Sequence, residues 1–357
     1  MKIVLMVPEM DVGGVEQGTF DLAQGLTDAG NTVFVFTAGG KLLTTLIKRG
    51  VKIILIPFHK KNPATLAYSL LRTRIIFSRI KPDIVHARSR VPAWIGYYAS
   101  FGLQGTHFIT GFHSYYNRHW PSKIMGRGER VLSVSHALAE YASEYFRVGN
   151  RVRVVYNGVF VDHFIKEKHD DIVRVGMLSR CGQGKGFGCF IEIINILKKK
   201  FPSVEGLIGL GIPSAGSGNF IEKLKKMIGA KGLTGSIAIL VNPRKEEFYK
   251  KIDIYVAPFT QPEGFGRVIV ESQLCGIPVV VSSLGASREV VLDGKTGFLV
   301  KPEPLAFIEP LERLIQNQNL RKIMGEDGRK WASAKFSVGQ MVEKTLEVYR
   351  ESMVSQN

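Results

Sequence analysis

Residues 173–190 read VRVGMLSRCGQGKGFGCF, and this stretch decides the fold class. An apolar run typical of a buried strand comes first, a glycine-rich loop follows, and an apolar helix-forming run completes the unit. A strand, a glycine loop and a helix in this order form a cradle for phosphate, because backbone N–H groups come close to the anion. Arg180 and Lys185 lie at the rim of the loop, where two cations would neutralise a diphosphate.

Two familiar phosphate motifs do not fit this loop. The P-loop pattern fails because Ser179 replaces its first glycine and Gly186 replaces its Ser/Thr. The dinucleotide pattern fails because Phe187 replaces its third glycine, and residues 198–200, about twenty positions further on, are lysines instead of a ribose-binding acid. Cys181 is either a reactive thiol or a small filling side chain, and we favour the latter. The loop is therefore expected to bind phosphate by another arrangement.

A pair of glutamates flanks the run EGFGRVIVE at residues 263–271. A loop ends here, Gly264 and Gly266 let the backbone approach a ligand, and a helix is expected to begin within a residue or two. Unpaired N–H groups and the helix dipole favour an anion at this point. Glu263 in the loop and Glu271, about two turns down, would hold polyol hydroxyls on either side of a diphosphate. The alternative is a capped helix with Glu271 in solvent.

The N-terminus contains a third strand–glycine–helix unit. The run KIVLMVP begins at Lys2, and Gly13-Gly14-Val15-Glu16 precedes a helical pattern. A glycine pair just after a first strand again lets the backbone approach a ligand. An ordinary strand-to-helix turn is the alternative.

Together these residues resemble the retaining GT-B glycosyltransferases of family 4. The matching motifs are Gly13-Gly14, Arg180 with Lys185-Gly186, and the E-x(7)-E pair Glu263/Glu271. Further matching segments are PDIVHARSR at 82–90, TGFH ending at His113, Val134-Ser135, Tyr156-Asn157-Gly158-Val159, and DGKTGFLV at 293–300. The segments HARSR-V-PAW and EGFGRVIVESQ are most similar to the branch that adds a sugar, often mannose, to the lipopolysaccharide inner core.

One departure concerns the crossing between the domains. Family members commonly have an aspartate directly after N-G-[VI], whereas here Phe160 and Val161 separate Val159 from Asp162. We therefore assign no role to Asp162.

The resemblance and the residue pattern imply the same fold class, α/β. Short apolar strands alternate with amphipathic helices in two blocks, which predicts two doubly wound parallel sheets. The expected strands span residues 3–7, 32–37, 52–56, 84–86, 107–110, 130–133, 153–155, 172–178, 204–209, 237–240, 254–256, 278–281 and 297–300. The GT-B resemblance makes these two Rossmann-like domains that face a central cleft. Residues 1–165 would bind the acceptor, residues 171–336 would bind the nucleotide sugar, and a helix over 337–357 would pack back on the first domain.

The resemblance also implies the chemistry, which is transfer of a hexose with retention of its anomeric configuration. The expected donor-binding residues are Gly13, Gly14, Arg180, Lys185, Glu263, Gly264, Phe265, Gly266 and Glu271. Of these, Glu271 would accept the ribose hydroxyls, and Glu263 would bind the donor sugar. The expected catalytic residues are His113, Arg180, Lys185 and Glu263, with His113 on the acceptor side. His86, His107, His119 and His136 are interpreted as structural. No D-x-D triplet occurs, so no metal or other cofactor is expected.

The charge of the chain predicts a polyanionic partner. Net charge is +17, and between Asp28 and Glu129 the only acidic residue is Asp83 among fifteen basic ones. Residues 64–81 form a basic amphipathic pattern in which Phe77 and leucines lie beside Arg72, Arg74 and Arg79, as expected for a helix on an anionic membrane surface. Arg88 and Arg90 are candidate contacts to an anionic glycolipid acceptor, and simple solvation is the alternative. No nucleic-acid-binding signature is present.

Composition sets the remaining limits. A chain of 357 residues predicts about two domains, and no run approaches the roughly 20 apolar residues of a membrane-spanning helix. Three cysteines without metal-ligand spacing and the absence of a signal-peptide pattern favour a cytoplasmic protein at the inner face of the membrane.

Several alternatives stay open at this point. The donor is GDP-linked or UDP-linked, and we favour GDP-mannose from the finer resemblance. A UDP-glucose or UDP-GlcNAc enzyme acting on a soluble or polysaccharide acceptor, or one acting on a soluble sugar phosphate, is a related possibility. A nicotinamide-dependent oxidoreductase and a non-catalytic polyanion-binding protein belong to other classes.

Overall fold

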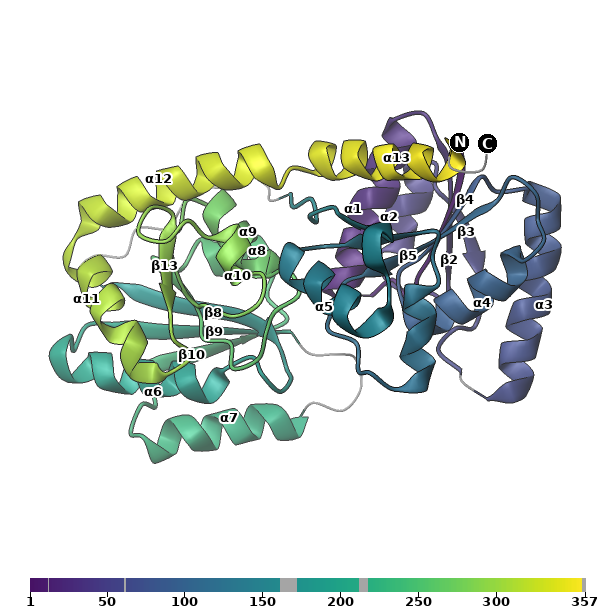
Figure 1. The fold of residues 1–357 in the computed structure, drawn as a ribbon. Coiled ribbons are helices and arrows are strands. Elements are labelled where there is room, and N and C mark those ends of the chain that lie inside the picture. The colour runs from purple at the N-terminus through teal and green to yellow at the C-terminus, as the bar shows by residue number, and fades with distance from the viewer. Residues whose placement is uncertain (12, 61, 161–171, 212–217, 355–357) are drawn as a thin grey trace. The chain divides into compact units, whose positions relative to one another are not determined.

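A computed structural model describes residues 1–11, 13–60, 62–160, 172–211 and 218–354. The chain divides into two compact units (Figure 1). The N-terminal unit comprises Met1–Val159 with Phe336–Asn357, and the C-terminal unit comprises Phe160–Lys335. Asp162 and the expected domain boundary at 165–171 lie outside the described residues.

The N-terminal unit is built on a seven-stranded sheet in the order β3-β2-β1-β4-β5-β6-β7. Its strands are β1 (Lys2–Met6), β2 (Thr32–Thr37), β3 (Lys52–Leu55), β4 (Ile84–Ala87), β5 (His107–Phe112), β6 (Arg130–Ser133) and β7 (Val152–Val154). Every neighbouring pair is parallel, and the register places Leu5 beside Val35 on one side and His86 on the other.

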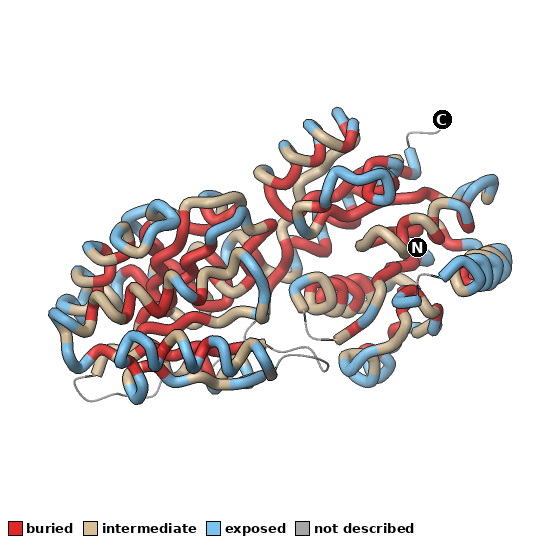
Figure 2. Tube along the Cα trace, turned by 90° about the horizontal axis from the view of Figure 1, so that it is seen from below, coloured by how far each residue is buried: buried red, intermediate tan, exposed pale blue. Residues whose placement is uncertain are grey.

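Helices surround this sheet. They are α1 (Gly14–Asp28), α2 (Leu43–Lys48), α3 (Pro63–Ile80), α4 (Arg90–Ser100), α5 (His136–Phe146) and α13 (Val338–Val354), with the 3₁₀ turns η1 (Trp120–Gly126) and η2 (Gly149–Arg151). Because a parallel sheet is covered on both faces, its strands are apolar at successive positions. Residues 3–7 in and after β1 accordingly have no exposed surface, and buried segments occupy the middle of the unit (Figure 2).

The C-terminal unit has a six-stranded parallel sheet in the order β10-β9-β8-β11-β12-β13. Its strands are β8 (Arg174–Arg180), β9 (Glu205–Gly211), β10 (Ile237–Val241), β11 (Ile254–Ala257), β12 (Val279–Ser282) and β13 (Gly297–Val300). Its helices are α6 (Phe187–Lys200), α7 (Gly218–Ala230), α8 (Lys245–Tyr249), α9 (Arg267–Leu274), α10 (Ser287–Val290), α11 (Ile308–Gln316) and α12 (Gln318–Lys335), with the 3₁₀ turn η3 (Pro304–Phe307). Helices α6 and α7 lie on one face of the sheet and α9 and α12 on the other (Figure 1).

Both sheets have the same topological switch point. The first strand of each, β1 or β8, lies between the second and the fourth strand of its unit, so the chain winds away from it in both directions. Ligands of doubly wound sheets bind at the carboxyl ends of the strands beside this switch. The prediction of two Rossmann-like parallel sheets is thus confirmed, and a ligand is expected at the carboxyl edge beside the switch point of each sheet.

The last helix belongs to the N-terminal unit. Helix α13 packs against α1, where a methyl group added at Gly25 would lie 2.5 Å from Val342. Its side chains Met341 and Tyr349 are buried in the same core as the β1 residues. Among all helices in the described ranges, none has the length and apolar composition needed to cross a membrane.

Candidate active site

The glycine-rich loop after β8 is shaped by contact with the loop after β11. Gly186 has φ +81°, and a methyl group added there would lie 1.8 Å from the carbonyl oxygen of Pro258. Gly184 also has positive φ, and its carbonyl accepts a hydrogen bond from the Thr260 N–H at 3.0 Å. Only glycine tolerates a position with both positive φ and such a close neighbour. These glycines therefore join the loops at 181–186 and 258–266 at one edge of the sheet.

This junction brings together two of the predicted residues that are 78 positions apart in the sequence. Lys185 Nζ lies 2.6 Å from Glu263 Oε2, and both side chains are only about a quarter exposed. The same ammonium lies 5.4 Å from the centre of the Phe259 ring. Arg180 ends β8 and is exposed. The predicted cations and the first glutamate thus share the carboxyl edge of β8 and β11.

Glu271 is buried and has partners on both oxygens, so the alternative of a solvated carboxylate is wrong. The side chain is 1% exposed. Lys245 Nζ donates to its Oε1 and the Tyr249 hydroxyl donates to its Oε2 at 3.1 Å, while Arg267 Nε lies 3.7 Å from Oε1. A buried charge requires such partners, because desolvation is otherwise too costly. Since α9 begins at Arg267, Glu271 also lies about one turn into the helix instead of two.

Two tyrosines beside the glutamates keep their protons. Burial raises the pKa of Tyr249, and the charge of Glu271 raises it further. Burial also raises the pKa of Tyr255, to which Glu271 and then Glu263 add. The Tyr249 hydroxyl therefore remains a hydrogen-bond donor to Glu271 at neutral pH.

The sequence reasoning missed Lys245 and Tyr249. Both lie on α8, at 26 and 22 positions from Glu271, so no short motif connects them. One feature of the sequence nonetheless indicates that Glu271 needs such partners. Glu271 follows the apolar run at 268–270, and an acid on the buried face of a helix requires a cation or a hydroxyl from another element.

In the N-terminal unit the expected glycine pair begins helix α1. Gly13 is the N-cap in an extended conformation and, as a glycine, has no side chain with which to cap the first turn. The N–H groups of Gly14 and Val15 thus lie in the first turn of α1, at the switch-point edge of the sheet. A helix N-terminus in this position favours the binding of an anion.

Arg88 follows β4 and is 3% exposed, which excludes simple solvation. Its Nε donates to Thr19 Oγ1 at 2.8 Å. A methyl group added at Gly18 would lie 3.0 Å from Asn157 Oδ1 and 3.4 Å from Arg88 Nη2, so Gly18 makes room for both side chains. The guanidinium is therefore held at the strand-end edge by α1.

Arg90 is also fixed instead of freely solvated. Its Nη1 donates to Asn117 Oδ1 at 3.2 Å and approaches Ser122 Oγ at 3.4 Å, and its guanidinium lies 5.7 Å from the Tyr116 ring centre. It begins α4, two positions after Arg88.

His113, directly after β5, lies beside His86, and no sequence motif groups the two residues. A methyl group added at Gly111 would lie 2.6 Å from His113 Nε2 and 2.9 Å from His86 Nε2. His86 Nδ1 is 2.8 Å from the Tyr349 hydroxyl of α13. Within the described residues, both ring nitrogens of His113 are buried without a hydrogen-bond partner. Burial and then the charge of Arg88 hold the pKa of both imidazoles well below the usual value.

The helix expected at 64–81 is α3, and part of its apolar pattern belongs to the core. Phe77 is buried and its ring centre lies 5.5 Å from that of Phe36, so it is not on a membrane-facing surface. Arg74 Nη1 donates to the carbonyl oxygens of Ala99 and Phe101 at 2.9 and 2.7 Å. Arg72 and Arg79 are exposed.

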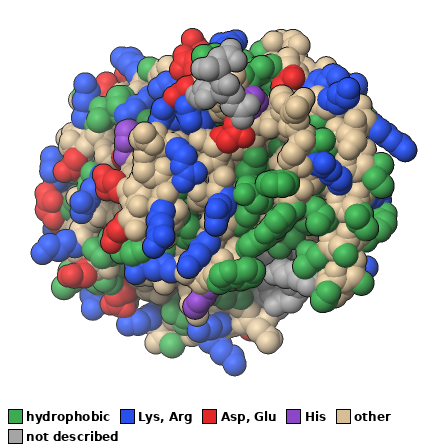
Figure 3. Space-filling view, turned by 45° about the vertical axis from the view of Figure 1, so that its right-hand side comes forward, with side chains coloured by type: hydrophobic (Ala, Val, Ile, Leu, Met, Phe, Trp, Pro, Cys, Tyr) green, Lys and Arg blue, Asp and Glu red, His purple; other side chains and the backbone are tan. Residues whose placement is uncertain are grey.

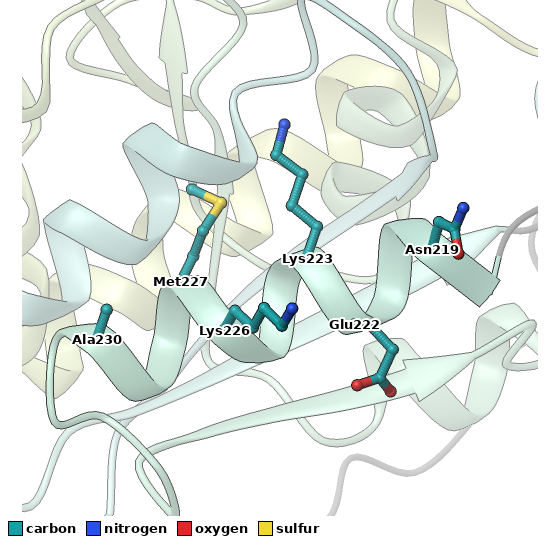
Figure 4. A pocket seen from close by; sticks show the side chains of 6 residues that line it. All are labelled: Asn219, Glu222, Lys223, Lys226, Met227 and Ala230. Carbon is teal, nitrogen blue, oxygen red and sulfur yellow. The ribbon is translucent and has the colours of Figure 1, made fainter.

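One recess of the C-terminal unit lies away from the predicted residues. It runs along α7 and is lined by side chains of that helix, as Figure 4 shows: Asn219, Glu222, Lys223, Lys226, Met227 and Ala230. Since none of the sequence-predicted residues lines it, it has no part in the site described above. Cys181 is half-buried and packs against the core of the same unit, as expected for a filling side chain.

Comparisons with known proteins concern the family and the fold of the chain. The model of Glycosyltransferase Family 4 matches residues 12–163, and that of Glycosyl transferases group 1 matches residues 160–331. The capsular polysaccharide biosynthesis glycosyltransferase CapM of Staphylococcus aureus is 26% identical over 310 residues, which cover 78% of this chain and 79% of CapM.

Solved structures share the fold over the whole chain. A glycosyltransferase from Rickettsia africae ESF-5 superimposes with a TM-score of 0.86 at 26% identity, covering 99% of both chains. Anabaena Alr3699/HepE, solved with UDP and glucose, has a TM-score of 0.82 at 22% identity and covers 98% of this chain and 100% of that one. The expectations of an oxidoreductase and of a non-catalytic binding protein are therefore wrong. The chain is a glycosyltransferase enzyme of group 1 with the GT-B fold.

Proposed function

We propose that the enzyme transfers a hexose from a nucleotide-sugar donor to a hydroxyl of an anionic glycolipid, with retention of configuration and without a metal. The observation that carries the donor half is the Lys185–Glu263 ion pair beside Arg180 at the β8/β11 edge. A cation and a carboxylate held together in this way are complementary to a diphosphate and a sugar, respectively. The N-terminal unit would bind the acceptor and the C-terminal unit the donor.

Donor binding would exchange one ion pair for another. The diphosphate would attract Lys185 and Arg180, and Glu263 would then be free to accept hydrogen bonds from the sugar hydroxyls. The backbone N–H groups of Phe265 and Gly266 and those at Gly13 and Gly14 would add donors. Because the leaving group gains charge as the glycosidic bond breaks, fixed cations stabilise the transition state more than the ground state.

Glu271 would accept both ribose hydroxyls. Lys245 and Tyr249 hold its carboxylate in place, so little reorganisation accompanies nucleotide binding. Base recognition would involve the backbone near Val241 and Asn242, where Asn242 has the uncommon φ of +48°.

Retention would follow from attack on the face that the diphosphate leaves. The acceptor oxygen forms the new bond to the anomeric carbon, the bond from that carbon to the phosphate oxygen breaks, and the acceptor proton passes to that phosphate oxygen. No protein nucleophile takes part. His113, neutral because its pKa is lowered, would hold a sugar hydroxyl, and Arg88 and Arg90 would bind anionic groups of the acceptor.

The identity of the sugar is a choice between two donors. GDP-mannose and a lipopolysaccharide-core acceptor are favoured by the similarity of residues 86–94 and 263–273 to core mannosyltransferases. UDP-glucose is the second candidate, since the Anabaena protein of the same fold was solved with it, and CapM points to a polysaccharide acceptor.

A panel of sugar nucleotides tests the proposal. Slow hydrolysis of one donor in the presence of EDTA, with release of the nucleoside diphosphate, is the expected result. With the acceptor present, proton NMR of the first product should show the donor's anomeric configuration. Turnover that requires a divalent metal, or an inverted product, would contradict this mechanism.

A further inference from the structure

The N-terminal unit carries an unusual group of exposed apolar side chains on α3, α4 and η1. Helix α4 packs against both α3 and η1. The docking face is defined by the six side chains of this region that are half or more exposed: Tyr68, Leu71, Ile75, Tyr98, Phe101 and Trp120. Their exposed fractions run from 50% for Tyr68 to 72% for Phe101. Large apolar side chains concentrated in this way mark an interaction site.

The aromatic part of this face is a rigid platform. The Trp94 ring lies 5.8 Å from Tyr98 in a stacked arrangement and 5.0 Å from Trp120. Trp94 Nε1 donates to the Pro121 carbonyl at 3.0 Å, which fixes the middle ring. The three rings are therefore ordered before any partner binds, so that little side-chain entropy is lost on docking.

Helix α3 adds an aliphatic stripe beside the platform. Tyr68, Leu71 and Ile75 are spaced i, i+3 and i+7, which puts them on one side of the helix. Arg74 donates to the carbonyls of Ala99 and Phe101, so this part of α3 is tied to the end of α4. The arginine that the sequence suggested as a membrane contact thus joins the two helices that form the docking face.

The charges around the face identify its partner. Exposed basic residues on or next to α3 and η1 in sequence are Arg72, Arg79, Lys81, Arg118, Lys123 and Arg127. Asp83, the single acid between Asp28 and Glu129, accepts a hydrogen bond from the Lys2 N–H at 2.6 Å. In Figure 3, where the side carrying α3 and α4 comes forward, hydrophobic side chains lie next to Lys and Arg and acidic ones are sparse among them.

We propose that this docking face binds the surface of an anionic lipid bilayer. Trp and Tyr prefer the membrane interface, the aliphatic side chains enter the acyl region, and the basic ones meet anionic headgroups. A second copy of the chain would bring like charges together at the rim, and a soluble glycan would leave Leu71, Ile75 and Phe101 without partners. The inference rests on the proposed function, because such docking would present a glycolipid acceptor to the N-terminal unit.

Vesicle binding tests the proposal directly. We expect the full chain to co-sediment with phosphatidylglycerol-containing vesicles and to bind phosphatidylcholine vesicles at least about tenfold more weakly. The double change Tyr98→Ala with Trp120→Ala should lower partitioning roughly tenfold or more, since each removes a large apolar contact. Arg72→Gln with Arg79→Gln should lower it about 25-fold at low salt, at about fivefold per basic residue, and less at high salt.

Matched variants provide the controls. Leu305→Ala with Ile323→Ala removes exposed apolar side chains of the C-terminal unit, and Lys322→Gln with Lys330→Gln removes exposed charges there. Both should bind vesicles as the unchanged protein does. Donor hydrolysis should persist in every variant, so that a failure of the catalytic proposal is seen separately from a failure of docking.

Tryptophan emission gives a second measurement. The chain has three tryptophans, and in a Trp331→Phe background the remaining two, Trp94 and Trp120, both belong to the platform. Anionic vesicles should shift their emission to shorter wavelength. Absence of binding to anionic vesicles, unchanged binding of the Tyr98/Trp120 variant, a dimer that this variant dissociates, or preference for a soluble anionic polysaccharide would each overturn the proposal.

Discussion

At the residue scale, the glutamates of the candidate site are each paired with a lysine from another element. Glu263 pairs with Lys185 and Glu271 with Lys245, in each case across a large distance in sequence. From the motif alone, Glu271 could be either a ligand-binding residue or a solvated residue on the outer face of the helix. Its burial at 1% exposure, with a lysine and a tyrosine on its oxygens, removes the second possibility.

Replacing Glu271 should affect catalysis far more than replacing a neighbouring acid. Glu271→Ala is expected to lower kcat/KM on the order of 10², the usual effect of removing one preorganised electrostatic group. Glu247→Ala, an exposed acid on α8, is the matched control and should leave kcat/KM unchanged. Steady-state donor hydrolysis measures both, and near-normal turnover of the Glu271 variant would remove its assigned role.

The two buried histidines should make stability depend on pH. Burial and the charge of Arg88 hold the folded-state pKa of His86 and His113 below the unfolded value of about 6.5. Their stabilising contribution is therefore complete above about pH 6.5 and is lost progressively as the pH falls toward the folded-state pKa, because the unfolded chain then binds more protons.

Urea unfolding at about pH 7.5 and about pH 5.5 checks this expectation. His113→Gln should reduce the loss of unfolding free energy between the two pH values, whereas His119→Gln, at an exposed position, should not. An equal loss in the His113 variant and the unchanged protein would show that this imidazole is solvated.

At the scale of elements, glycines of the loop at 181–186 determine how closely it approaches the loop at 258–266. Gly186 must be glycine because of both its positive φ and its contact with Pro258, whereas Gly182, in the same loop, has no neighbour among the described residues within 4 Å of an added methyl group. Comparing the two positions distinguishes a glycine that the backbone geometry requires from one that it does not require.

Gly186→Ala should disrupt the loop and Gly182→Ala should not. The first change introduces strain of about 1–3 kcal/mol and a clash that can be relieved only by moving the loop that carries Glu263. We expect at least a roughly tenfold weaker nucleoside diphosphate affinity, by calorimetric titration, for Gly186→Ala alone. Equal affinities of the two variants would mean that the loop does not contact the nucleotide.

The strands could be predicted from the sequence more accurately than the side-chain contacts between distant elements. All thirteen expected strands are present, and β8 is displaced by only two residues, because a strand covered on both faces is a continuous apolar run. Three contacts could not be predicted, because each joins residues 22 or more positions apart. They are Lys245–Glu271, Tyr249–Glu271 and His86–Tyr349. The mixed role of α3 was hidden because Phe77 and Leu71 are equally apolar, yet only one faces the core.

At the scale of the whole molecule, the last segment, Phe336–Asn357, belongs to the N-terminal unit. Removing residues 336–357 would expose the α1 surface and delete the buried side chains Met341, Leu346 and Tyr349. The expected cost, about 5 kcal/mol or more, is comparable to the stability of an entire domain. The C-terminal unit retains its own core and should still bind GDP or UDP.

Hydrogen exchange followed by mass spectrometry measures this outcome. In the truncated chain, amides of β1 to β7 should lose protection, while those of β8 to β13 keep it and gain more with nucleotide. Val354→Ala, at an exposed position of α13, is the control and should behave as the intact chain. Unchanged protection of β1 after truncation would show that α13 is dispensable for the N-terminal unit.

We propose above all that Arg180 and Lys185 hold the donor's diphosphate. A crystal structure of the enzyme with bound GDP or UDP tests it most directly. We predict phosphate oxygens at about 2.7–3.2 Å from Lys185 Nζ and from the Arg180 guanidinium, with Lys185 released from Glu263. A nucleotide bound elsewhere, with Lys185 still paired to Glu263 and Arg180 in solvent, would contradict the account.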